Sequence, residues 1–220
     1  MGIGVQRIYW LGVLLWGCAS HPIAEKEPWS VGAAVLLRTQ LDADAAIVAV
    51  DAGLLSRCYL QRDDRPAWCG PTGPRAQADA LLRMLRQATD DGLRLEDYGL
   101  ERIEDGLGRW RNPGAKPSLA STMRLEVLLT RAFLAYAGHL QRGRVDPRAI
   151  HPQWQAPMQA ADLSGLLQTA LDLQQVESAL ARLRPPQAGY YHLRQALRAY
   201  REIAAAGGWL EVEPSGGAPL

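Results

Sequence analysis

The residues of this sequence best suited to covalent chemistry are its three cysteines, Cys18, Cys58 and Cys69. A cysteine nucleophile attacks as the thiolate and needs a nearby base to form it. No histidine lies close to Cys58 or Cys69 in the sequence. Neither a catalytic thiolate nor a metal site is therefore favoured at this pair.

His139, His151 and His192 are widely separated in the sequence. Convergence of these histidines on a metal stays open, but a core or surface position is the more common fate of such residues. The sequence contains no phosphate-binding glycine loop, no Gly-x-Ser-x-Gly turn and no His-Glu-x-x-His pair. We expect no catalytic residue, no cofactor and no metal in this chain.

The one local acidic cluster comprises Glu96, Asp97, Glu101 and Glu104. Helical spacing puts Asp97 and Glu101 on one face, and a pair of carboxylates is what many hydrolases use. Acids near a helix start more often act as caps and as partners of the helix dipole. A carboxylate-based hydrolase is therefore an alternative and not the leading hypothesis.

Residues 1–18 have the pattern of an export signal, with Arg7 before the apolar run Ile8–Trp16. The ending Leu15-Trp16-Gly17-Cys18 resembles a bacterial lipobox, which implies that Cys18 becomes the lipidated first residue of the mature chain. An ordinary secretory signal cleaved nearby, or a membrane anchor left in place, are the alternatives. The expected location is the periplasm, as an outer-membrane lipoprotein.

The composition indicates a globular protein, because 48% of the 220 residues are hydrophobic and 21% are charged. The formal net charge is +1, from 24 basic and 23 acidic residues, which gives no electrostatic reason to expect nucleic-acid binding. We expect a polar linker over 19–29, one helical domain over 30–212 and a loose tail over 213–220.

The central element is predicted over Leu125–Leu140, where apolar residues cover nearly every side of a helix that ends at Gly143. Other amphipathic stretches predict helices over 31–41, 76–89, 97–110, 163–171, 176–183 and 189–206, with Asp97 and Asp162 as N-caps. On the last helix, an apolar row is expected to face the core: Tyr190, Leu193, Leu197, Tyr200 and Ala204. Its arginines, Arg194, Arg198 and Arg201, are expected to face solvent.

A hairpin is predicted over Arg57–Gly70, with the turn at Arg62–Pro66. Cys58 and Cys69 would then face each other across the strands, and in an oxidising periplasm we expect a disulfide between them. Closing that loop would add roughly 3 kcal/mol of stability. Two half-buried thiols are the alternative. The expected fold is mainly α: a compact orthogonal bundle of about seven or eight helices with one small β-hairpin.

Several motifs, taken in order, carry a resemblance to a known family. They are Cys58-Tyr59 through Pro66-Ala67-Trp68, Asp91-Gly92-Leu93 with Asp97-Tyr98, Leu128-Leu129-Thr130 through His139-Leu140, Gly143-Arg144-Val145-Asp146-Pro147, Trp154, Leu183-Arg184-Pro185, Tyr190 with Leu193, Ala196-Leu197 and Tyr200-Arg201, and Gly207-Gly208-Trp209. Over roughly residues 50 to 212 the chain resembles the N-terminal scaffold domain of the large periplasmic L,D-transpeptidases, which cross-link peptidoglycan.

That resemblance implies a scaffold without chemistry of its own. In those enzymes a peptidoglycan-binding module and a catalytic domain with a His-Gly-Cys signature follow the scaffold, and no cysteine of this sequence follows a His-Gly pair. The leading hypothesis is a non-catalytic exported scaffold that positions an L,D-transpeptidase catalytic module, another envelope protein or peptidoglycan, with the lipid anchor as its membrane contact. The alternatives are the N-terminal part of a genuine transpeptidase and a carboxylate-based peptidoglycan hydrolase. The expected structural core comprises Trp68, Leu125, Leu129, Phe133, Tyr136, Trp154, Tyr190 and Leu197.

Overall fold

The computed structural model describes residues 28–43, 50–153 and 162–209, and these residues form a mainly α-helical fold, as predicted. The predicted signal with Cys18, the residue Trp154 and the tail over 213–220 lie outside the described residues. The described α-helices are α1 Pro28–Ala43, α2 Ala52–Leu60, α3 Ala76–Arg86, α4 Leu100–Arg111, α5 Leu119–Arg142, α6 Pro147–Ile150, α7 Leu163–Asp172, α8 Val176–Ala181 and α9 Ala188–Ala205. Two short 3-10 helices, η1 Ala88–Asp91 and η2 Leu95–Tyr98, separate α3 from α4.

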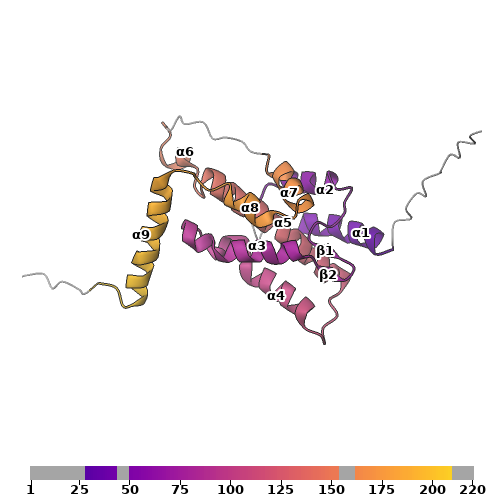
Figure 1. Ribbon diagram of the computed structural model, residues 1–220. Helices are drawn as coiled ribbons and strands as arrows, with labels where there is room; N and C mark the ends of the chain where they lie inside the picture. Colours follow the sequence, from indigo (N-terminus) through magenta and orange to yellow (C-terminus); the bar gives the residue numbers. More distant parts are fainter. Residues whose placement is uncertain (1–27, 44–49, 154–161, 210–220) are drawn as a thin grey trace, which may run out of the picture.

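Helix α5 lies in the middle of the molecule and packs against α1, α3, α4, α7, η2 and β1 (Figure 1). The helix begins at Leu119 rather than at Leu125, because the Ser118 side chain caps it by accepting a hydrogen bond from the Ser121 N–H. It ends at Gly143, whose φ of 81° is the positive angle that favours glycine. The predicted central helix is therefore confirmed, with an additional N-terminal portion.

The prediction of strands around Cys58 is wrong. Residues Ala52–Leu60 form α2, with Leu55, Cys58 and Tyr59 buried at the spacing of one helix face. The small antiparallel sheet lies further on, where β1 Cys69–Gly70 pairs with β2 Gly73–Pro74. The Arg62–Pro66 segment connects a helix to this sheet, so its turn residues do not join two strands.

Helices α1, α3, α4 and α7 cover α5, and α8 packs on α3 and α7. Asp162 caps α7 by accepting a hydrogen bond from the Gly165 N–H at 3.0 Å, as predicted. The N-cap position of α4 is Gly99 and not Asp97, because Gly99 has φ 64° and the chain turns there out of η2. No helix in the described part of the chain has the length and apolar character needed to cross a membrane.

Helix α9 lies across one end of the bundle and extends beyond it (Figure 1). It packs mainly against η1. None of its residues is fully buried, in contrast to α5. The way in which α9 is attached therefore differs from that of the other long helices.

Candidate docking site

The central helix carries a fully buried carboxylate, that of Glu126. Its Oε1 accepts a hydrogen bond from the backbone N–H of Ala67 at 2.6 Å, and its Oε2 accepts from those of Trp68 and Cys69, both at 2.9 Å. Burial raises the pKa of Glu126, although the three N–H donors act in the opposite direction. The carboxylate fastens the segment that enters β1 to the middle of α5.

Thr130 continues this network one turn further along α5. Its Oγ1 lies 2.6 Å from the Tyr59 hydroxyl of α2 and accepts a hydrogen bond from Trp68 Nε1 at 2.9 Å. The Trp68 ring packs on Phe133, with ring centroids 6.1 Å apart. The polar groups of α2, α5 and the segment before β1 thus satisfy one another inside the core, which makes this network structural.

Cys58 and Cys69 are buried free thiols, so the predicted disulfide is not formed. The reason is geometric: Cys58 lies on α2 beside Ser164 of α7, whereas Cys69 lies in β1 near the Thr122 carbonyl of α5. Burial raises the pKa of both thiols. This shift is the reverse of what a thiolate nucleophile requires.

The histidines and the acidic cluster are engaged in local contacts or exposed. His139 Nδ1 lies 2.9 Å from the Tyr98 hydroxyl, and burial lowers the pKa of His139. Asp97, Glu96 and Glu104 form ion pairs with three arginines, Arg144, Arg94 and Arg86, and Glu101 is exposed. His151 and His192 are exposed, and the described residues contain no group of three His, Cys, Asp or Glu that could hold a metal ion. The geometry of the acidic cluster thus fits surface ion pairing.

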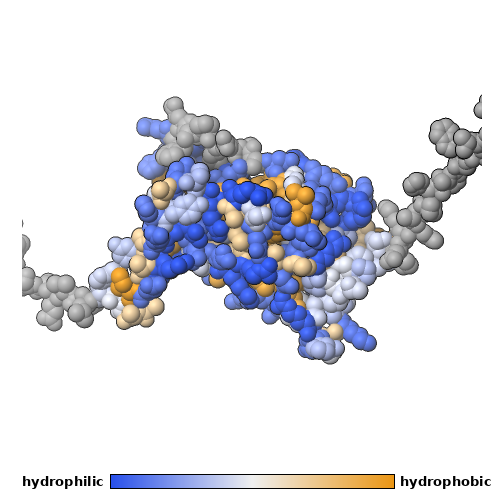
Figure 2. Space-filling model, in the orientation of Figure 1, coloured by the Kyte–Doolittle hydropathy of each residue, from blue (hydrophilic) through white to orange (hydrophobic). Residues whose placement is uncertain are grey.

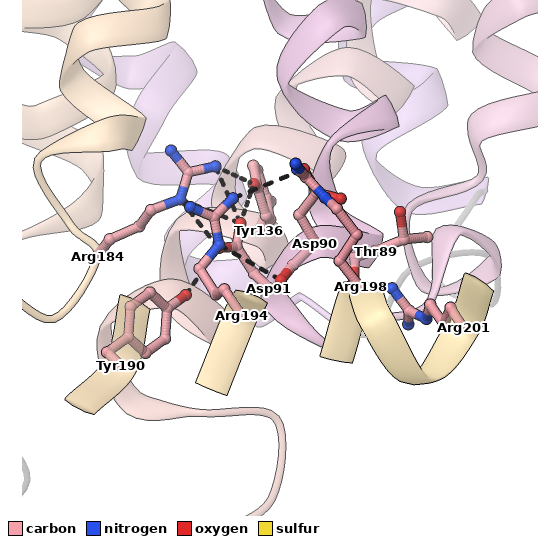
Figure 3. Close-up of polar contacts among 9 residues, drawn as sticks. All are labelled: Thr89, Asp90, Asp91, Tyr136, Arg184, Tyr190, Arg194, Arg198 and Arg201. Atoms are coloured by element: carbon pink, nitrogen blue, oxygen red, sulfur yellow. Dashed lines mark hydrogen bonds and ion pairs between the residues drawn. The ribbon is translucent and has the colours of Figure 1, made fainter. Parts of the chain in front are cut away.

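The strongest polar site outside the core is centred on Asp91, at the end of η1 (Figure 3). The Asp91 side chain is only 1% exposed and receives hydrogen bonds from Arg184 at 2.9 to 3.1 Å. The hydroxyls of Tyr136 and Tyr190 also donate to it, at 3.0 and 2.8 Å. Burial and the neighbouring carboxylate raise the pKa of Tyr190 to about 12, so its hydroxyl stays a donor at neutral pH.

The arginines of α9 extend this site. Arg198 and Arg201 are exposed, as predicted, but both also contact the bundle, and the Arg194 side chain is only 23% exposed. Arg194 Nε lies 2.9 Å from Asp91 Oδ1, and Arg198 reaches the Asp90 carboxylate at 3.4 Å. Arg201 donates to the carbonyl oxygen of Thr89. The arginine face of α9 is therefore the face that holds the helix to the bundle, as Figure 3 shows.

The predicted apolar row of α9 is divided. Tyr190 and Leu197 are half-buried on the side of the bundle, whereas Leu193, Tyr200 and Ala204 point away from it, contrary to prediction. Leu193 is 71% exposed and Tyr200 is 59% exposed, and Ala196 and Ile203 are exposed beside them. Trp209 is 66% exposed, and its ring lies 5.7 Å from that of Tyr200. We call Leu193, Ala196, Tyr200, Ile203 and Trp209 the outer row. Figure 2 shows apolar residues on the part of α9 near its C-terminal end.

The residues predicted to form the core divide between two environments. Trp68, Leu125, Leu129, Phe133 and Tyr136 are buried around α5. Tyr190 and Leu197 are half-buried on the side of α9 that contacts η1 and the residue after it. The geometry thus provides an attached helix with an apolar face that is exposed in the described part of the chain, which is a means of binding another molecule.

One comparison with known proteins identifies the family. A model of the family described as "Scaffold domain" matches residues 53–197, from the start of α2 to the middle of α9. The search of curated proteins and the search of solved structures found no match. The matched region includes the Glu126 network, the Asp91 site and the first half of the outer row. Because this match covers more than half of the chain, the protein belongs to the scaffold-domain family, consistent with a scaffold domain of L,D-transpeptidases.

Proposed function

We propose that this protein is a non-catalytic, exported scaffold that supports peptidoglycan cross-linking by holding an L,D-transpeptidase catalytic module against α9. Membership of the scaffold-domain family supports the general role. The observation that carries the specific proposal is the orientation of α9, with its arginines on the bundle and the outer row in solvent.

The outer row has the spacing of a helix that binds in a groove. Leu193, Ala196, Tyr200 and Ile203 follow one another at intervals of three, four and three residues, which aligns them along one stripe. Burying apolar surface stabilises an interface by about 25 cal/mol per Å² before the costs of association. The exposed side chains of Leu193 and Tyr200 therefore offer a partner more apolar surface to bury than the polar faces of the bundle do.

The Asp91 site gives this helix a defined direction. Apolar packing alone permits a helix to slide or rotate. Charge-assisted hydrogen bonds from Arg184 and Arg194 to one buried carboxylate are directional, so they fix the position and rotation of α9 relative to η1. A module bound to the outer row would consequently be held at a fixed angle to α5. This arrangement serves equally well for a module on a separate chain and for one that continues the same chain.

The experiment measures the affinity between the purified mature protein and the catalytic domain of an L,D-transpeptidase from the same organism. Leu193→Gln should weaken binding by about tenfold or more, because it removes a central apolar contact. Leu60→Gln is the matched control, since Leu60 is 69% exposed on α2 and lies outside the outer row. Absence of binding by the unmodified protein, or equal affinities for both variants, would contradict the proposal.

A further inference from the structure

A second surface feature lies away from α9: a cleft of about 390 Å³ between α4 and α5, with Gln40 of α1 at its rim. The close approach of the two helices beside this cleft depends on Gly106. A Cβ added at Gly106 would lie 2.8 Å from Leu125 Cδ1, so a larger residue would require the Leu125 side chain to shift. The cleft is thus built by the packing of the bundle and does not depend on α9.

Positive charge dominates the lining of this cleft. Arg102 and Arg109 of α4 lie seven residues apart on one helix face, and Arg124 of α5 lies in the wall that lines the cleft with them. All three guanidinium groups belong to exposed residues, and none has a hydrogen bond or ion pair within the described residues. The single carboxylate in the lining is that of Asp105.

Two other arginines on or beside α4 have ion-pair partners. Arg111, at the end of α4, is paired with Asp79, and Arg86 of α3 is paired with Glu104. The three arginines of the lining lack the ion-pair partners that these two have, and they lie together at a concave part of the surface. Charges of one sign in a cleft focus the electrostatic field and raise the local concentration of ligands of opposite charge.

The rest of the lining adds apolar surface. Trp110, Leu125 and Leu128 contribute apolar walls. The charged groups of the lining are thus three guanidinium groups and one carboxylate, so the chemistry of the cleft matches a ligand that presents several acceptor oxygens beside apolar groups.

We propose that this cleft binds a short peptide carrying two or more carboxylates, and that the ligand is the stem peptide of peptidoglycan. The volume fits a small ligand and is too small for a folded partner. Arginine is suited to carboxylates because its planar group can donate two parallel hydrogen bonds. The identity of the ligand rests on the proposed function, whereas the carboxylate chemistry rests on the cleft alone.

The test is calorimetric titration of the purified mature protein with a synthetic stem tetrapeptide whose carboxylates are free. The triple variant Arg102→Gln, Arg109→Gln, Arg124→Gln should bind at least about tenfold more weakly. Arg182→Gln, an exposed arginine outside the cleft, is the control and should bind as the unmodified protein does. Circular dichroism checks that each variant is folded.

Two further measurements distinguish recognition of carboxylates from general anion binding. The same tetrapeptide with amidated carboxylates should bind much more weakly, and Asp105→Asn should tighten binding because it removes the one opposing charge. Equal binding of the free and amidated peptides, unchanged binding by the triple variant, or full competition by millimolar inorganic phosphate would overturn the proposal. Because no catalytic module is present in this assay, a negative result would overturn the peptide-binding proposal without testing the docking role of α9.

Discussion

Replacing Glu126 by glutamine tests the network that fixes the segment before β1 to α5. The glutamine oxygen can take the place of Oε2 and keep the hydrogen bonds from Trp68 and Cys69. The glutamine NH₂ group then takes the place of Oε1, which in the unmodified protein accepts a hydrogen bond from the Ala67 N–H at 2.6 Å. Two donors therefore face each other in the variant. One buried N–H loses its acceptor, which costs about 1 to 3 kcal/mol, and the two remaining bonds lose about 1 kcal/mol each with the charge. Relief from burying a charge offsets part of this loss. We expect a net destabilisation of about 2 to 4 kcal/mol.

The assay is chemical denaturation followed by circular dichroism, with Glu101→Gln on the exposed face of α4 as the matched control. The deficit should also depend on pH. Because burial raises the pKa of Glu126 above its ordinary 4.5, the unmodified protein gains stability as the pH falls toward 4.5, and the glutamine variant does not. The deficit should therefore be larger at pH 5 than at pH 8. A change below about 0.5 kcal/mol, or one equal to that of the control, would refute the role assigned to this carboxylate.

Three further outcomes are expected. Asp91→Asn should release α9, because Tyr190 and Arg194 of that helix lose the charge of their buried partner; hydrogen exchange should show lost amide protection in α9 and unchanged protection in α5, and equal loss in both helices would contradict this. Cys58 and Cys69 should resist iodoacetamide in the folded protein and both react after unfolding without reductant, whereas an unreactive pair in the unfolded chain would indicate a disulfide. Because burial lowers the pKa of His139, stability should decline as the pH falls below 6.5, and His139→Gln should lessen that decline; identical pH profiles would argue against it.

Local signals in the sequence predicted the parts of the fold that depend on local chemistry. The continuous apolar character of α5 marks it as the centre, since a helix with buried residues on nearly every side must be surrounded. The ends of helices were also predictable where a residue has a specific backbone role, as with Gly143 and Asp162. Burial of Glu126 required partners from elsewhere, and these prove to be the backbone N–H groups of residues 67–69 together with Tyr59.

The errors arise where contacts distant in the sequence decide between two local possibilities. The periodicity of α9 separates an apolar face from an arginine face, but it does not say which one meets the bundle. Asp90 and Asp91 decide this, about a hundred residues earlier in the chain. Similarly, Leu55, Cys58 and Tyr59 have helical spacing, but the aromatic residue and the turn-forming Arg62–Pro66 segment favoured a strand. Packing against α5 and α7 favours the helix.

The most direct test of the central claim is photo-crosslinking in cells from a photoreactive phenylalanine placed at Tyr200 in the outer row, with the same residue at Leu60 as the control. We expect a covalent adduct between position 200 and an L,D-transpeptidase catalytic domain, identified by mass spectrometry, with no such adduct from position 60. Equal yields of that adduct from both positions, or its absence from position 200, would contradict the assignment of α9 as the docking surface.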